Sequence, residues 1–254
     1  MKTELRYLLK DKYNWDEVSI QKYFEDPNQN VDPSILRDTK RLRNGEPLAY
    51  IIGWVEFLGS KIEVNKNVLI PRVETEFWVQ KVINNCKSKN QKISVLDLCC
   101  GSGCIGISIL NRLPKSFVTF ADISPKALEQ TKENLISCNI SNSRYKIIES
   151  NLFESLKDIY DLILTNPPYV STKNTNPDLK FEPSKALYAG LQGLDLIKKI
   201  LSAFPKFLKL GGEIYIEISE DQKDELQKLL TGKYNNFEFI KDQNGLCRVL
   251  HLVV

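Results

Sequence analysis

The tetrapeptide Asn166-Pro167-Pro168-Tyr169 carries the most specific chemistry in this sequence of 254 residues. It ends the largely apolar run 161–165, which is typical of a buried strand. Consecutive prolines restrict the backbone and remove two N–H donors, so the Pro167 carbonyl and the Asn166 side-chain oxygen remain as acceptors. These acceptors can hold both N–H bonds of a planar amide or amino group, while Tyr169 lies against its flat face. The pattern predicts a site that positions a planar nitrogen as a nucleophile; the alternative is a proline-stiffened turn.

A second candidate site is the glycine-containing loop after the apolar run 94–98. Gly101 and Gly103 lack a Cβ atom, which lets the backbone turn sharply and approach a ligand closely. Gly106 and Asp122, an acid nineteen residues after Gly103, complete the pattern G-x-G-x-x-G followed by an acidic residue. That pattern binds nicotinamide dinucleotides, and the same geometry also serves S-adenosylmethionine. The loop alone leaves both ligands open.

Asp97 and the tetrapeptide favour S-adenosylmethionine. A carboxylate beside a pyrophosphate would be repulsive, whereas a carboxylate beside the positive sulfonium and ammonium groups is favourable. A nicotinamide enzyme also has no evident use for the Asn-Pro-Pro-Tyr pattern. Asp122 could grip the ribose hydroxyls or, alternatively, lie at a helix start with Ser124 and Pro125 as its cap and first residue. We therefore expect an S-adenosylmethionine-dependent methyltransferase that acts on a planar nitrogen and releases S-adenosylhomocysteine.

The elements that must position these motifs alternate between strands and helices from about residue 74. Strands are expected at 94–98, 117–122, 145–149, 160–165, 212–218, 237–242 and 247–253, and helices at about 103–113, 125–138, 195–207 and 222–230. The alternation predicts a doubly wound, mostly parallel α/β sheet, and the short turn with Asn244-Gly245 predicts an antiparallel C-terminal hairpin. Seven strands in this arrangement resemble the Rossmann-like sheet of class I methyltransferases.

The N-terminal part of the chain has a different pattern. Residues 1–53 have apolar positions at helical spacing, and residues 54–70 alternate apolar and polar positions as in a β-hairpin. We expect three units: a helical N-terminal substrate-binding domain at 1–53, a β-hairpin linker at 54–73 and the methyltransferase domain at 74–254.

Composition narrows the class of protein. The net charge of +3 is spread along the chain and does not demand a nucleic-acid partner, and no apolar run approaches the roughly 18 residues that span a bilayer. The charged N-terminus does not read as a secretory signal. The six cysteines form no C-x-x-C pair and His251 is the only histidine, so we expect reduced thiols and no metal site. The expected location is the cytoplasm.

With both motifs in place, the chain resembles the release-factor glutamine methyltransferase family (PrmC/HemK) over nearly its whole length. Besides the two motifs, the segments that carry the resemblance are Gly45–Gly53, Glu56-Phe57, Leu69–Glu76, Phe181–Leu187, Gly193, Asp242, Gly245 and Arg248-Val249. The segment 70–76, Ile-Pro-Arg-Val-Glu-Thr-Glu, is more particular than Asn-Pro-Pro-Tyr, which adenine methyltransferases share. Cys99-Cys100 stands where the family usually has glycine and a small residue, and Leu152 where it has a larger residue.

The resemblance implies N5-methylation of the glutamine in the Gly-Gly-Gln motif of class 1 peptide chain release factors, which tunes translation termination. By position, the residues implied to bind the cofactor are Gly101, Ser102, Gly103 and Asp122, with Asn151 and Leu152 flanking adenine; we add Asp97, Ile123 and Asn166. The implied substrate-binding residues are Asn166, Pro167, Pro168 and Tyr169, of which Asn166, Pro167 and Tyr169 are expected to be catalytic. Arg72 and Glu76 are further candidates for substrate binding, or else they mark a helix start with acids in its first turn. We expect a monomer whose helical unit helps to hold the release factor, with no membrane and no direct nucleic-acid contact needed.

Two other functions stay open at this point. An adenine-N6 methyltransferase acting on DNA or RNA would use the same tetrapeptide to hold a flipped base, but it also predicts a basic recognition region, and none is visible. A non-catalytic S-adenosylmethionine-binding protein would not need the tetrapeptide at all.

Overall fold

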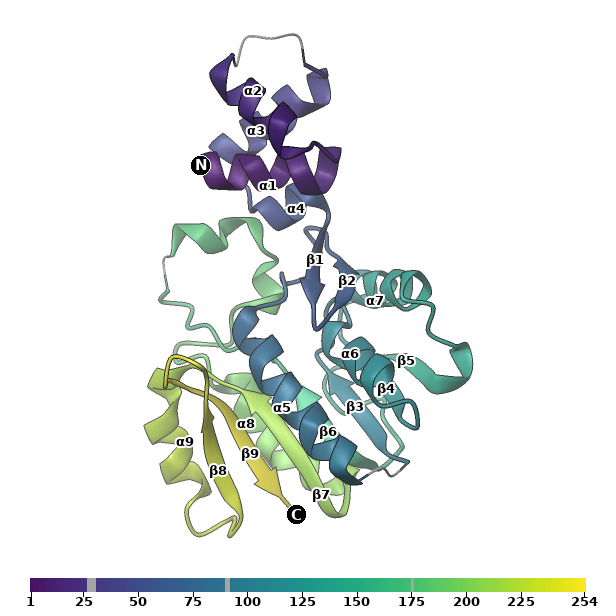
Figure 1. The fold of residues 1–254 in the computed structure, drawn as a ribbon. Coiled ribbons are helices and arrows are strands. Elements are labelled where there is room, and N and C mark those ends of the chain that lie inside the picture. The colour runs from purple at the N-terminus through teal and green to yellow at the C-terminus, as the bar shows by residue number, and fades with distance from the viewer. Residues whose placement is uncertain (27–30, 90–91, 175) are drawn as a thin grey trace.

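The computed structural model describes residues 1–26, 31–89, 92–174 and 176–254. A small helical unit at the N-terminus is joined through a two-stranded hairpin to a larger α/β core (Figure 1). Within the described ranges, no helix is both long enough and apolar enough to cross a membrane.

The core is built on seven strands in the order β5-β4-β3-β6-β7-β9-β8. Their bounds are β3 Ser94–Leu98, β4 Phe117–Asp122, β5 Tyr145–Glu149, β6 Tyr160–Thr165, β7 Leu208–Glu217, β8 Phe237–Lys241 and β9 Cys247–Val253. β9 runs antiparallel to β7 and β8, and the other neighbouring pairs are parallel. The predicted doubly wound sheet with an antiparallel C-terminal hairpin is therefore confirmed. β7 begins at Leu208 rather than at residue 212, because an irregular register lets it also pair with the start of β6.

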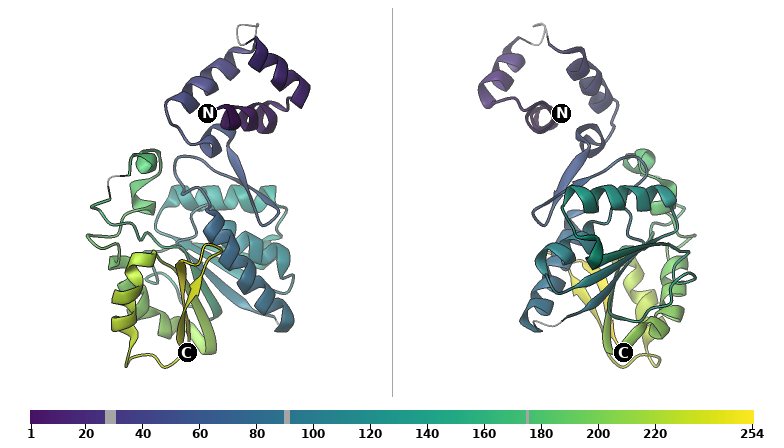
Figure 2. Two further views of the ribbon diagram at one scale, coloured as in Figure 1. Left: turned by 60° about the vertical axis from the view of Figure 1, so that its left-hand side comes forward. Right: turned by 90° about the vertical axis from the view of Figure 1, so that its right-hand side faces the viewer.

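Helices cover both faces of this sheet (Figure 2). α5 (Val73–Lys89), α6 (Cys104–Arg112) and α7 (Pro125–Ser137) share one apolar core, and α8 (Asp195–Ala203) and α9 (Lys223–Leu230) share another. Short 3-10 helices lie at η1 Asn142–Arg144, η2 Pro177–Phe181, η3 Ser184–Ala186, η4 Phe204–Phe207 and η5 Glu220–Gln222. Successive residues of β3 alternate between the cores, Val95 in the first and Leu96 in the second, as expected for a strand that is buried on both faces.

The strand order reverses between β3 and β6. From β3 the chain proceeds outward to β4 and β5, and it then returns to β6 on the other side. Leu98 at the end of β3 lies opposite Thr165 at the end of β6. The glycine loop follows Leu98 directly and the tetrapeptide follows Thr165 directly, so this reversal brings the two predicted motifs to one crevice.

The helical unit contains α1 (Lys2–Tyr13), α2 (Glu17–Glu25), α3 (Pro33–Arg43) and the short α4 (Leu48–Ile52). It has an apolar core of its own, which includes Leu8, Leu9, Ile20, Ile35 and Ile51. This cluster is separate from the two cores of the sheet.

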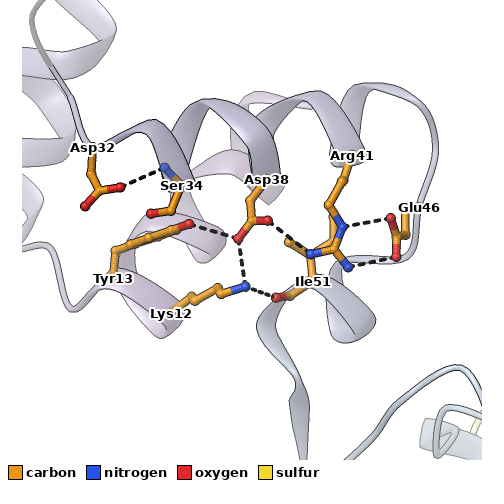
Figure 3. Close-up of polar contacts among 8 residues, drawn as sticks. All are labelled: Lys12, Tyr13, Asp32, Ser34, Asp38, Arg41, Glu46 and Ile51. Atoms are coloured by element: carbon orange, nitrogen blue, oxygen red, sulfur yellow. Dashed lines mark hydrogen bonds and ion pairs between the residues drawn. The ribbon is translucent and has the colours of Figure 1, made fainter.

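A charged network ties the helices of this unit together (Figure 3). The nearly buried carboxylate of Asp38 in α3 accepts three bonds, from Lys12 Nζ at 2.7 Å, Tyr13 Oη at 2.8 Å and Arg41 Nη1 at 3.0 Å. Arg41 also donates to Glu46 in a bidentate pair at 2.8 and 2.9 Å. Glu46 in turn contacts Lys66 Nζ at 3.0 Å, which carries the network into the linker.

The hairpin consists of β1 (Trp54–Phe57) and β2 (Ser60–Glu63), which pair antiparallel. It lies against α7, because Glu63 N donates to Asn134 Oδ1 at 2.8 Å and Asn134 Nδ2 donates to the Glu63 carbonyl at 2.9 Å. Asn134 Nδ2 also donates to the Ser102 carbonyl at 2.9 Å, so the hairpin and the glycine loop share one anchor.

Candidate active site

A cavity of about 950 Å³ opens at the carboxyl ends of β3, β4 and β6. Its lining includes residues of the glycine loop, the acid that ends β4, the turn after β5 and the tetrapeptide after β6. The lining residues that were predicted from the sequence are Gly101, Ser102, Asp122, Ile123, Asn151, Leu152, Asn166 and Pro168. The tertiary structure thus gathers residues from four separate loops around one space large enough for a nucleoside-sized ligand.

The glycine loop is held in a sharply turned conformation. Cys99, Gly101 and Gly103 have positive φ angles of 59°, 56° and 78°. A Cβ atom on Gly103 would lie 2.8 Å from Cγ2 of Thr131. The loop lies so close to α7 here that a side chain at this position would clash. Thr131 Oγ1 donates to the Gly101 carbonyl at 2.9 Å, which fixes the loop on the same helix.

Asp122 lies where the glycine loop meets the start of α7. Its carboxylate accepts a bond from Gly101 N at 3.0 Å and one from Ser124 N at 2.9 Å. Burial raises the pKa of Asp122. Ser124 caps α7, since its side chain accepts from Ala127 N at 3.3 Å. This position fits both roles predicted for Asp122, ribose binding and a helix start, because the acid precedes α7 and also lines the cavity.

Asp97 lies beneath the loop with no exposed surface and does not line the cavity. One carboxylate oxygen accepts from Gly106 N at 2.8 Å, and the other has no partner among the described residues. Burial, with a smaller contribution from Asp122, raises the pKa of Asp97 to about 7. A carboxylate held beneath a ligand loop disfavours a phosphate there and favours a positively charged group.

Asn166 and Pro168 of the tetrapeptide line the cavity, whereas Pro167 does not; both prolines are buried. Asn166 Nδ2 donates to Thr75 Oγ1 of α5 at 3.2 Å. The Tyr169 hydroxyl donates to Glu217 Oε1 at 3.0 Å. Burial, followed by the nearby charge of Glu217, raises the pKa of Tyr169, so its hydroxyl stays protonated.

The carboxylate of Glu217 is the centre of these contacts. Glu217 ends β7, is 1% exposed and accepts three bonds, from Thr75 Oγ1 at 2.6 Å, Trp78 Nε1 at 2.8 Å and Tyr169 Oη at 3.0 Å. Burial raises its pKa. Sequence reasoning did not single out Glu217 or Thr75, although an acid within the otherwise apolar run 214–218 was a signal that could have identified the first of them.

Metal ligands are not gathered here. Among the residues that the structure describes, no group of three or more His, Cys, Asp or Glu side chains is placed to hold a metal ion. All six cysteines are free thiols, and burial raises the pKa of Cys99, Cys100 and Cys104 beside the loop.

Comparison with known proteins identifies the family. The family model of the methyltransferase small domain matches residues 75–182. A release factor glutamine methyltransferase from Francisella tularensis is 37% identical over 222 residues, which cover 85% of this chain and 76% of that protein. One from Thermodesulfovibrio yellowstonii is 36% identical over 242 residues, 92% of this chain and 86% of that protein. The chain belongs to the release factor glutamine methyltransferase family.

Solved structures show that this member of the release factor glutamine methyltransferase family shares its fold with other methyltransferases. The T. thermophilus 16S rRNA N2 G1207 methyltransferase, solved in complex with AdoMet and guanosine, superposes with a TM-score of 0.59 at 16% identity. The superposition covers 79% of this chain and 49% of that chain. The chain is therefore a methyltransferase in fold as well as in sequence family, and a methyltransferase of this fold binds S-adenosylmethionine.

Arg72 and Glu76, two of the predicted substrate residues of this family member, lie outside the cavity lining and contact other parts of the protein. The Arg72 guanidinium forms an ion pair with Glu182, which also accepts from Ile70 N at 3.1 Å. Glu76 Oε1 accepts from Leu58 N at 2.7 Å in the turn of the hairpin. These contacts tie the linker to the core, and a direct contact of Arg72 or Glu76 with substrate stays a prediction. Gly103, Pro167 and Tyr169 adjoin the lining residues without being part of the lining.

Proposed function

We propose that this enzyme transfers a methyl group from S-adenosylmethionine to the side-chain amide nitrogen of a glutamine, the one in the Gly-Gly-Gln motif of class 1 release factors. The observation that carries the proposal is the position of Asn166, whose side chain faces the same cavity as the glycine loop in a chain of this family. We place the reaction in the cytoplasm and expect a monomer, as predicted from the sequence.

Three features of the cavity fit S-adenosylmethionine. Gly101 and Ser102 offer backbone close to the ligand space, Asp122 offers carboxylate oxygens for ribose hydroxyls, and the exposed apolar side chain of Ile123 can cover an adenine ring. The buried carboxyl of Asp97 below the loop suits a ligand with positive rather than phosphate groups. When bound, S-adenosylmethionine supplies an electrophilic methyl group on a sulfonium.

The residues of this chain then have to position a weak nucleophile. The lone pair of an amide nitrogen is delocalised into its carbonyl, which makes the nitrogen a weak nucleophile. The reaction therefore depends on holding that nitrogen in line with the methyl group that it attacks. Asn166 Oδ1 and the Pro167 carbonyl accept the two N–H bonds, and the ring of Tyr169 limits the tilt of the amide plane. Orientation of this kind contributes roughly 7–11 kcal/mol to lowering a barrier. The amide proton becomes acidic as the new bond forms and leaves to solvent, so no strong base is required.

The proposal is tested by transfer of a labelled methyl group to a purified class 1 release factor, compared with the same factor carrying Gln→Ala in its Gly-Gly-Gln motif. We expect label only on the factor with the intact glutamine. Label on neither factor, with label on DNA or RNA in a parallel reaction, would instead support the adenine methyltransferase.

Replacing Asn166 by Ala tests its role directly. We expect Asn166→Ala to lower kcat about 100- to 1,000-fold, because one preorganised polar contact to the reacting group is lost. Calorimetric titration with S-adenosylhomocysteine serves as the control and is expected to show an affinity within a few-fold of the wild type. Near-wild-type turnover would remove Asn166 from the mechanism.

A further inference from the structure

We infer that Thr75 and Glu217 are positioning residues, which fix the Asn166 side-chain amide with its oxygen free for the substrate. The inference rests on the proposed function. Thr75 is part of the cavity lining and Glu217 is buried behind it, and we assign both a role through their contacts with Asn166 and Tyr169. Glu217 ends β7, Thr75 lies in the first turn of α5, and Asn166 follows β6, so three separate elements meet at this point.

The direction of each hydrogen bond follows from which atoms can donate. The indole Nε1–H of Trp78 is a donor only, and it lies 2.8 Å from Glu217 Oε2. An ionised Glu217 can only accept, so with Glu217 ionised Oε2 accepts from each of its neighbours. Thr75 Oγ1 lies 2.6 Å from the same oxygen, so the threonine hydroxyl donates its only hydrogen bond to Glu217.

The consequence passes from Thr75 to Asn166. With its proton given to Glu217, Thr75 Oγ1 can only accept from its other neighbour, which is the Asn166 amide at 3.2 Å. That neighbour must be Nδ2, since two acceptors would repel each other. Oδ1 is thereby left for an N–H of the substrate amide. If the Asn166 amide were flipped, its NH2 group would face the NH2 group of the substrate. One of the two acceptors that position the substrate would then be lost.

Tyr169 is held by the same carboxylate. Its hydroxyl lies 3.0 Å from Glu217 Oε1, the oxygen that Trp78 and Thr75 do not use. Glu217 is 1% exposed, so water does not compete for these contacts. One buried carboxylate thus fixes the two side chains of the tetrapeptide that face the planar group of the substrate.

The matched pair Thr75→Val and Thr75→Ser isolates the hydroxyl. Valine has nearly the same shape but provides no acceptor for Asn166 Nδ2, whereas serine keeps it. We expect Thr75→Val to lower kcat about 10- to 100-fold, a smaller loss than for Asn166 itself, and Thr75→Ser to recover most of the activity. The KM for the release factor and the affinity for S-adenosylhomocysteine should both stay within about threefold of the wild type. Equal kcat values for the valine and serine variants would overturn the inference.

A second pair tests the polarity argument at Glu217. Glu217→Gln can keep an oxygen toward Trp78 and Thr75 and turn its amide nitrogen toward the Tyr169 hydroxyl, which can accept. We therefore expect Glu217→Gln to stay within about fivefold of the wild-type kcat, and Glu217→Leu to lose about as much as Thr75→Val. A loss for Glu217→Gln as large as for Glu217→Leu would show that the charge matters, and would overturn the assignment. Wild-type enzyme that labels no glutamine would instead refute the proposed function, so the two failures are distinguishable.

Discussion

At the scale of single residues, Asp97 shows how the fold alters the chemistry of a side chain. Burial raises the pKa of Asp97 from 3.8 to about 7, and one of its oxygens has no partner among the described residues. The folded state therefore binds a proton at this carboxyl more tightly than the unfolded chain does. A raised folded-state pKa contributes stability that is present below about pH 4 and is lost as the pH rises through about 7.

Replacing Asp97 by Asn removes this titration while keeping an acceptor for Gly106 N. We expect the free energy of unfolding of Asp97→Asn, relative to the wild type, to increase between about pH 4 and pH 8. The increase is at most about 4 kcal/mol, because each pH unit between the two pKa values is worth about 1.4 kcal/mol. Denaturant unfolding of both proteins across this range measures it. A difference that does not change with pH would contradict the raised pKa.

At the scale of elements, the segment between β6 and α8 depends on one close backbone contact. Gly193 has a φ of 69°, and a Cβ atom there would lie only 1.9 Å from the carbonyl oxygen of Tyr169. The Gln222 side chain donates to the same carbonyl at 2.9 Å, so η5 also holds this part of the loop. The tetrapeptide is therefore positioned from its far side by a residue that touches neither ligand in our proposal.

Gly193→Ala is expected to push the tetrapeptide out of place and to lower kcat about 100-fold, since a displacement near 1 Å at a reacting group has that effect. The control is Gly232→Ala, because Gly232 has a similar φ of 79° but no atom within 4 Å of an added Cβ. That variant carries only the left-handed strain of about 1 kcal/mol and should keep its activity. Methyl-transfer assays and thermal unfolding of both variants separate displacement from strain. Equal loss of activity in both would rule out the contact.

At the scale of the whole molecule, the charged network of the helical unit (Figure 3) continues through the Glu46–Lys66 ion pair into the linker. Asp38, which is 1% exposed, is the centre of this network. The last residue of the network is Lys66, which lines the cavity. We propose that the helical unit holds the release factor, as the sequence predicts. The network would then help to orient the helical unit as it presents the glutamine to Asn166.

Asp38→Ala leaves the partly buried Lys12 and Arg41 without this partner, and we expect it to lower stability by about 2 kcal/mol. Hydrogen exchange should become faster in α1–α4 and stay unchanged in the sheet. The KM for a whole release factor should rise at least about tenfold, while the KM for a short peptide containing Gly-Gly-Gln stays the same. The matched control, Glu17→Ala, breaks only the exposed pair with Arg6, and it should change neither quantity. A parallel rise in both KM values would argue against a substrate-holding role.

The sequence by itself determined the family, the sheet and the two motifs that meet at the cavity. β3, β4, β5, β6 and β9 have the predicted bounds, because short apolar runs bounded by turn residues are local signals. The glycine loop and the tetrapeptide were recognisable for the same reason, since each keeps its chemistry within a few consecutive residues. β7 was predicted to start too late, because its first residues owe their strand conformation to pairing with β6 rather than to an apolar run of their own.

Only the tertiary structure decided which groups orient the catalytic side chains. Thr75 and Glu217 are 142 residues apart, and they meet because α5 packs across the carboxyl end of β7. Arg72 and Glu182 are 110 residues apart, and their ion pair depends on the path of the segment after the tetrapeptide. Hydrogen bonds act over about 3 Å in space and leave no periodic trace along a chain, so a single sequence shows the residues that touch the substrate more readily than those that hold them in place.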